Sequence, residues 1–234
     1  MNAWSDLVHA PGFALDFRVQ QPAPAAPDAL LVLLHGVGGN ETNLAGLARA
    51  IPANTLVVLP RGPLEIGPGQ HAWFRVSFTA TGPQIVASEA EHSRLALVRF
   101  IEQLQAAHAI PAARTLVAGF SQGGILSASV GLSAPERVRG FAVLAGRILP
   151  ELEPQVADPA SRLAGLHALI AHGRDDDKLP LAWAQRADAW LTRLAVPHEL
   201  RLYPGGHGIS DGMARDFQAW VTGLSQASPR ITAA

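Results

Sequence analysis

The residues with the clearest chemical potential form a Gly-x-Ser-x-Gly pattern near the middle of the chain. Segment 115–124 reads TLVAGFSQGG, so an apolar run leads into Gly119, Ser121 and Gly123, and a second apolar run follows. A strand that turns tightly into a helix lifts a serine hydroxyl clear of the sheet edge, and small neighbours prevent clashes there. The helix N-terminus also points at the place where negative charge develops. The pattern predicts a nucleophilic Ser121, with an ordinary glycine-rich turn as the alternative.

A serine nucleophile needs a base, because an unassisted hydroxyl reacts poorly at neutral pH. In such sites the partners follow in the order serine, acid, histidine, each after a later strand. Segment 204–208 reads PGGHG, and we expect its His207 to take the proton of Ser121. His35 and His172 also end expected strands. Their position before a glycine suits a structural hydrogen bond better than a base.

The acid is expected in segment 172–180, which reads HGRDDDKLP. Three adjacent carboxylates, Asp175, Asp176 and Asp177, cannot all face one imidazole, and physical reasoning ranks them equally. The two that do not face it would be solvated, with the flanking basic residues as compensation. One of the three should orient the histidine and stabilise its charged form.

Two backbone donors must also stabilise a tetrahedral oxyanion, one after the nucleophile and one after an early strand. Gln122 supplies the first. Segment 31–40, LVLLHGVGGN, is a strand that runs into a glycine-rich loop, and we expect the N–H of Val37 to be the second donor. A phosphate cradle is the alternative, but the loop lacks the Walker lysine and the spaced glycines of dinucleotide sites.

Composition narrows the classes of protein that could carry these residues. The chain has 234 residues, 48% of them hydrophobic, and a net charge of −1. One domain with a full core is the expected outcome, and no basic face suggests a nucleic-acid partner. The absence of cysteine excludes disulfides and a cysteine nucleophile. The first residues lack a signal-peptide pattern and no apolar run could span a bilayer, so we expect a cytoplasmic protein without stable membrane association.

Short apolar runs alternate with segments of helical period, which predicts an α/β fold with a mainly parallel central sheet and helices on both faces. The expected strands are 14–19, 29–34, 55–59, 114–118, 138–144, 166–171 and 199–203. The expected helices are 89–107, 125–132, 179–194 and 211–224. In the first helix, Leu95, Val98, Ile101 and Leu104 are expected to face the core.

The expected boundaries are a single α/β domain over 1–226 and a frayed tail over 227–234. Segment 61–84 is rich in glycine and proline, and we expect a long loop or lid near the active site.

In order, the segments LLHGVGGNE, PRG, AWF, GFSQGG, HGRDDDKLP and GGHGI resemble the phospholipase/carboxylesterase family, which includes acyl-protein thioesterases and bacterial carboxylesterases. The resemblance spans nearly the whole domain and implies the α/β-hydrolase fold. The HGxxDxxxP pattern of the family, counted from His172 to Pro180, aligns its acid with Asp176. The resemblance also supports His207, and it implies that Val37 and Gln122 form the oxyanion hole.

The same resemblance implies that Trp73 and Phe74 lie beside the active site, where they would line an acyl pocket. Alternatively, they pin the long loop to the core. The chain departs from the eukaryotic thioesterase pattern after the first HG, where it has Gly39, Asn40 and Glu41. This departure favours the bacterial carboxylesterase branch.

We therefore expect acyl transfer to Ser121 and hydrolysis of the acyl-enzyme by water that His207 activates. The substrates would be small carboxylic esters or thioesters of short to medium acyl chain, with no metal or organic cofactor. An acyl-protein thioesterase or lysophospholipase activity is one alternative. A non-catalytic receptor or binding module is another, although such proteins usually lack a triad member and none is missing here. A peptidase or acyltransferase, and a homodimer, also stay open, because fold and triad fix neither the acyl acceptor nor the oligomeric state.

Overall fold

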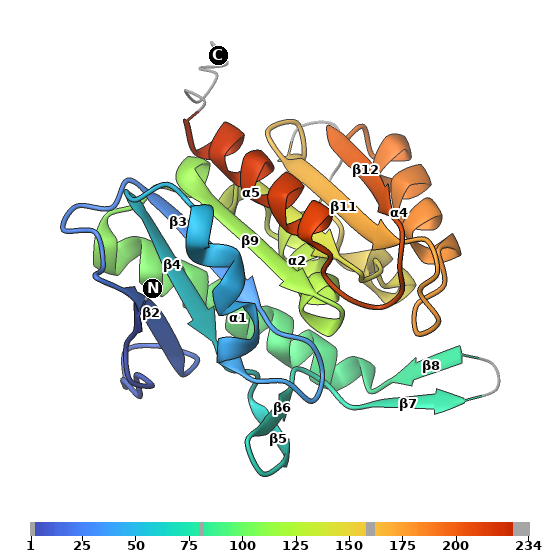
Figure 1. The fold of residues 1–234 in the computed structure, drawn as a ribbon, viewed down its shortest axis with the longest axis horizontal. Helices are drawn as coiled ribbons and strands as arrows, with labels where there is room; N and C mark the ends of the chain where they lie inside the picture. Colours follow the sequence, from blue (N-terminus) through green and yellow to red (C-terminus); the bar gives the residue numbers. More distant parts are fainter. Residues whose placement is uncertain (1–2, 80–81, 158–161, 227–234) are drawn as a thin grey trace.

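An eight-stranded, mostly parallel sheet organises the chain in a computed structural model that describes residues 3–79, 82–157 and 162–226 (Figure 1). The strand order is β1-β2-β4-β3-β9-β10-β11-β12, and only β1 and β2 run antiparallel to their neighbours. The strands are β1 (Ala3–Trp4), β2 (Phe17–Gln21), β3 (Ala29–Leu34), β4 (Thr55–Pro60), β9 (Thr115–Phe120), β10 (Gly140–Leu144), β11 (His167–Gly173) and β12 (His198–Tyr203). The α/β fold class expected from the sequence is confirmed.

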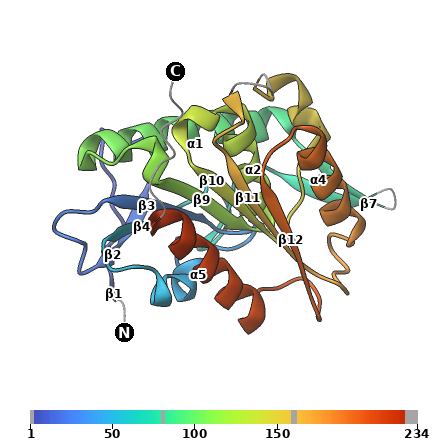
Figure 2. The same cartoon turned by 90° about the horizontal axis from the view of Figure 1, so that it is seen from above.

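Helices cover both faces of this sheet (Figure 2). One face packs against α1, α2 and α4, and the other packs against α5 and the 3-10 helix η1. The bounds are η1 (Glu41–Ala50), α1 (Ala87–His108), α2 (Gln122–Ser133), α4 (Ala182–Arg193) and α5 (Asp211–Gln226), with short 3-10 turns η2 (Ala112–Arg114), η3 (Pro135–Arg137) and η4 (Pro150–Gln155).

Strand β3 shows why the sheet needs both layers. All six of its residues, ALLVLL, are buried. Leu30, Val32 and Leu34 pack on the side of α1 and α2, whereas Leu31 and Leu33 pack on the side of η1 and α5. Because successive strand residues point to opposite faces, a continuous apolar run is stable only where both faces are covered.

The core-facing stripe of α1 differs from the expected one. Leu95 is 54% exposed, while Leu97, Phe100, Ile101 and Leu104 are fully buried. The helix is rotated so that Phe100 reaches Phe17 of the antiparallel strand β2, with ring centroids 5.2 Å apart. Ile101 and Leu104 are buried as expected and Val98 packs against the core, so tertiary packing moved the buried face only part of a turn, away from Leu95.

Segment 61–84 is not an extended loop but contains two antiparallel hairpins. The first is β5 (Leu64–Gly67) with β6 (Gln70–Ala72), and the second is β7 (Val76–Thr79) with β8 (Gly82–Ile85). Gly69 has φ +67°, a conformation that glycine adopts without strain at the tight turn of the first hairpin. The second hairpin projects from the body of the protein (Figure 1).

Two further expectations concern the C-terminal tail and membrane-spanning helices. The tail expected over 227–234 lies outside the described residues. Within the described part of the chain, no helix combines the length and the hydropathy that crossing a bilayer requires.

Candidate active site

Ser121 lies in a strained turn between β9 and α2. Its backbone has φ 53° and ψ −114°, which is unusual for a residue with a side chain. A Cβ atom built at Gly119 would overlap the backbone of Gly123, and one built at Gly123 would overlap the carbonyl group of Leu34. The two flanking positions therefore require glycine because strand, turn and neighbouring strand touch there.

The hydroxyl of Ser121 begins a chain of hydrogen bonds to two later loops. Its Oγ lies 3.0 Å from Nε2 of His207, and Nδ1 of His207 lies 2.7 Å from Oδ2 of Asp176. With Nδ1–H donating to the carboxylate, Nε2 is free to accept the serine proton. The Phe120 ring packs against the imidazole at a centroid distance of 5.0 Å. The arrangement can generate a nucleophilic alkoxide.

The backbone of the 173–181 loop decides which carboxylate faces the imidazole. Asp176 is only 5% exposed, and its Oδ1 accepts hydrogen bonds from the N–H groups of Lys178 and Leu179 at 2.9 and 2.8 Å. Its other oxygen is thereby aimed at His207. Asp175 and Asp177 are exposed, with contacts to the Gly205 N–H and to the Lys178 ammonium group.

The two other strand-end histidines are fully buried and bonded to backbone. His172 donates from Nε2 to the carbonyl of Leu179 at 2.8 Å, which supports the loop that carries Asp176. His35 accepts from the N–H of Gly62 through Nε2 at 2.9 Å, so its Nδ1–H donates to the carbonyl of Gly36 at 2.7 Å. Burial lowers the pKa of His35 to about 4. His35 is therefore a neutral structural group at physiological pH.

The loop after β3 lies beside Ser121 and is fixed by the first hairpin. The N–H of Gly38 donates to the carbonyl of His71 at 2.9 Å, and the N–H of His71 donates to Gly39 at 2.7 Å. Among the residues that the structure describes, no protein acceptor pairs with the backbone N–H of Val37 or of Gln122. Both residues line the same cavity as Ser121, so these two donors are available to an oxyanion.

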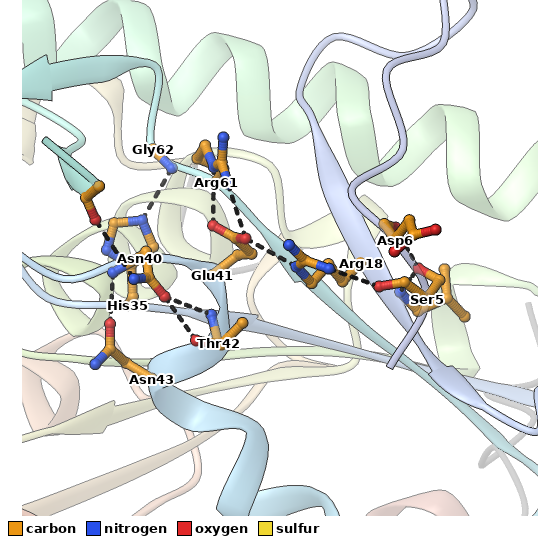
Figure 3. Close-up of polar contacts among 12 residues, drawn as sticks. Ser5, Asp6, Arg18, His35, Asn40, Glu41, Thr42, Asn43, Arg61 and Gly62 are labelled. Atoms are coloured by element: carbon orange, nitrogen blue, oxygen red, sulfur yellow. Dashed lines mark hydrogen bonds and ion pairs between the residues drawn. The ribbon is translucent and has the colours of Figure 1, made fainter. Parts of the chain in front are cut away.

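A buried carboxylate ties the helix that follows this loop to the sheet (Figure 3). Glu41, at the first position of η1, is 3% exposed and accepts hydrogen bonds from Arg18 at 2.9 Å and from Arg61 at 2.8 and 2.9 Å. Burial favours the protonated carboxyl, but the two guanidinium groups outweigh it and lower the pKa of Glu41 to about 2. Asn40 caps the same helix by accepting from the N–H of Thr42. The loop is thus held at both ends.

Trp73 and Phe74 occupy different places around the site. The side-chain amide of Gln122 accepts from the N–H of Trp73 at 2.7 Å and donates to the carbonyl of Phe74 at 2.6 Å. The indole of Trp73 donates to the carbonyl of His35 at 2.9 Å. Phe74 lies in the wall of the cavity, whereas Trp73 is buried behind it.

A cavity of about 250 Å³ opens onto Ser121 and His207. Its wall is mostly apolar and includes Val76 and Ile85 from the second hairpin and Ile125 from α2. Such a cavity can hold a short acyl chain next to the nucleophile. Among residues 3–79, 82–157 and 162–226, no cluster of three or more His, Asp or Glu side chains is placed to hold a metal ion.

The most notable cavity residue that the sequence analysis did not single out is a charged one. Arg147 lies in its wall, three residues after the end of β10. Its position after a parallel strand, on the same sheet edge as Ser121, was the available signal, because ligands bind at the carboxyl ends of such strands.

Comparison with known proteins agrees with this geometry. Residues 15–223 match the model of the Phospholipase/Carboxylesterase family. The chain belongs to this family. It is 27% identical over 216 residues to acyl-protein thioesterase 1 of Eremothecium gossypii, a match that covers 86% of this chain and 88% of that protein. It is also 27% identical over 216 residues to a probable carboxylesterase, SOBER1-like, of Arabidopsis thaliana, which covers 85% and 79%.

Solved structures give the same result at the level of the fold. The crystal structure of a carboxylesterase from Mesorhizobium loti superposes with a TM-score of 0.78 at 26% identity, covering 94% of this chain and 100% of that one. Family and relatives together identify the protein as a serine hydrolase that acts on ester bonds, as expected from the sequence.

Proposed function

We propose that this protein is a carboxylesterase in which Ser121 is the nucleophile, His207 the general base and acid, and Asp176 the residue that orients His207. The observation that carries the proposal is the continuous hydrogen-bonded chain from Ser121 through His207 to Asp176, with distances of 3.0 and 2.7 Å. It begins at a strained serine that opens onto an apolar cavity. This is the arrangement that acyl transfer to serine requires.

The reaction follows from these positions. Ser121 Oγ attacks the ester carbonyl as its proton passes to His207 Nε2, and the N–H groups of Val37 and Gln122 stabilise the oxyanion. His207 then returns the proton to the departing alcohol, which leaves an acyl-serine. Water attacks the acyl-serine as His207 takes its proton, and His207 then returns that proton to Ser121 Oγ as the acid is released.

The size of the cavity supports small substrates. A volume of about 250 Å³ is just below the usual range of ligand sites and fits esters of short to medium acyl chain. Relatives named acyl-protein thioesterase support a second candidate, cleavage of thioesters by the same residues.

A chain-length series of 4-nitrophenyl esters and the matching thioesters, from acetyl to dodecanoyl, tests the proposal. We expect the kcat/KM to peak at a short to medium chain, and we expect Ser121→Ala to lower ester hydrolysis by about 10⁴-fold or more. Rates near background for the wild-type protein across the series would favour a binding module instead. Activity retained in Ser121→Ala would refute the assignment of the nucleophile.

A further inference from the structure

Arg147 is a buried cation in the wall of the cavity that contains Ser121 and His207. It is 5% exposed, and its Nε has no hydrogen-bond partner. Within the part of the chain that the structure describes, its guanidinium makes no hydrogen bond or ion pair. The carbon atom of its guanidinium group, Cζ, lies 4.5 Å from the centroid of the Trp183 ring. The carboxylate of Glu151 attracts this charge through space and raises the pKa of Arg147, but it is not within ion-pair distance.

Such a side chain is costly to bury. A guanidinium presents five N–H donors and stays charged, so a buried one normally pairs with a carboxylate or with several acceptors. Stacking on an aromatic ring offsets part of this cost but satisfies no N–H donor. Burial also lowers the pKa of Arg147 from its ordinary value, which is the direction expected for a cation that lacks an anionic partner.

Arg147 is close to the reacting groups. It follows β10 through Ala145, which has φ 49°, and Gly146. A Cβ atom built at Gly146 would lie 3.0 Å from the carbonyl oxygen of Ser121. The backbone therefore passes the nucleophile at Gly146, and Arg147 is one of the residues that line the cavity.

The charges around this cavity are unbalanced. Of the described residues that line it, Arg147 and Lys178 are cationic and none is Asp or Glu. Lys178 is 61% exposed and lies near Asp177, at 3.4 Å, so its charge is solvated. Among the described residues that line the cavity, Arg147 is then the one buried charge.

From this juxtaposition of an unpaired buried guanidinium and the Ser121 hydroxyl, we infer that the natural ester carries a carboxylate group, which Arg147 binds while Ser121 attacks the ester carbonyl. The inference rests on the proposed esterase function and narrows its substrate class to half-esters of dicarboxylic acids or esters of hydroxy acids. The planar fork of a guanidinium matches a carboxylate, with two parallel N–H···O bonds. A single buried positive charge balances a monoanion, which favours a carboxylate over a phosphate dianion.

Matched substrates that differ only in charge test this inference. The first pair is 4-nitrophenyl hydrogen adipate and its terminal carboxamide, which place the charge on the acyl side. The second pair is the butyrate esters of 5-hydroxypentanoate and 5-hydroxypentanamide, which place it on the alcohol side and are followed by pH-stat. We expect the wild-type protein to prefer the anionic member of at least one pair by about tenfold to a hundredfold in kcat/KM.

Variants then assign the preference to Arg147. Arg147→Met keeps an unbranched side chain beside Trp183 but removes the guanidinium group, and it should abolish the preference by slowing the anionic ester alone. Arg147→Lys should retain part of the preference. Arg186→Met is the matched control. Arg186 lies over the same ring, at 4.8 Å, but does not line this cavity, so its loss should leave the preference unchanged.

Two results separate this inference from the proposed function. Absence of a preference in both pairs, or a preference that persists in Arg147→Met, overturns the role of Arg147. Hydrolysis of the carboxamide that is lost in Ser121→Ala still upholds the esterase.

If Arg147→Met does not fold, inhibition of 4-nitrophenyl butyrate hydrolysis by the wild-type protein tests the role of Arg147 instead. Glutaramate should compete at least tenfold better than uncharged glutaramide, and equal inhibition contradicts the inference.

Discussion

The substitution Glu41→Gln removes the negative charge at the centre of the network in Figure 3 while it keeps the shape of the side chain. Glu41 accepts three hydrogen bonds, one from Arg18 and two from Arg61. The variant leaves both guanidinium groups without a carboxylate. We therefore expect it to lower the free energy of unfolding at pH 7.

The magnitude follows from the pKa of Glu41. A lowering of the pKa from 4.5 to about 2 corresponds to about 3 kcal/mol of preferential stabilisation of the charged form. Glu41 is nearly fully buried, but the side chains of Arg18 and Arg61 are 25% and 26% exposed, so water recovers part of the loss. We expect a destabilisation of about 2 to 3 kcal/mol.

Urea unfolding of the wild-type protein and Glu41→Gln between pH 7 and pH 2.5 measures this difference. The pKa is lower in the folded state, so the stabilisation is complete above the unfolded value of about 4.5 and is lost as pH falls toward 2. The gap between the two proteins should narrow in that window. The control Glu136→Gln, in an exposed pair with Arg162, should cost less than about 1 kcal/mol. A gap that does not change between pH 7 and pH 2.5 would refute the reasoning.

Three further predictions concern the elements that position the nucleophile. Asp176→Asn should lower kcat by about 10⁴-fold with little change in KM for a chromogenic ester, and an equal effect of Asp177→Asn would contradict it. Gly123→Ala should reduce the yield of folded protein and lower its melting temperature, because its Cβ would overlap the Leu34 carbonyl; an unchanged melting curve would contradict this. The pKa of His35 in the folded protein, about 4, lies below the ordinary 6.5, so folding favours the neutral imidazole. The contribution of His35 to the free energy of unfolding is therefore complete above pH 6.5, and up to about 3 kcal/mol of it is lost as the pH falls to 4. The unfolding free energy of His35→Gln should depend less on pH in that window; a parallel dependence would contradict it.

The sheet could be predicted from the sequence because its strands are short apolar runs that both layers cover. The run 29–34 coincides with β3, and the others start or end within one to three residues of the observed strands. The signal of α1 was weaker. Leucines lie on more than one side of this helix, and the aromatic contact of Phe100 selected the buried face. The spacing of residues within a helix does not reveal a contact with a distant strand.

The choice among the three aspartates illustrates a different limit. Local composition is the same at Asp175, Asp176 and Asp177, so the residues alone could not rank them. What distinguishes them in the structure is the backbone, since the N–H groups of Lys178 and Leu179 donate hydrogen bonds to one oxygen of Asp176. Resemblance to a family pattern selected the same residue because that pattern fixes the length of the loop up to Pro180. Its catalytic role remains a prediction.

The segment 61–84 was expected to act as one loop or lid, but its contacts divide it into two parts. Gly62 forms a hydrogen bond with His35, and His71 forms hydrogen bonds with the loop after β3. Trp73 forms hydrogen bonds with Gln122 and with His35. Each of these bonds holds the backbone around the proposed oxyanion donors. Movement of residues 62–74 would break several of them at once and would misplace the donors.

Residues 76–85 have a different relation to the site. Of this second hairpin, Val76, Pro83 and Ile85 line the cavity. Its two strands pair with each other and not with the central sheet. Substitutions at these three positions can therefore change the shape of the cavity without disturbing the Ser121–His207–Asp176 geometry. The first part of the segment supports the chemistry, and the second part sets which acyl chain fits beside it.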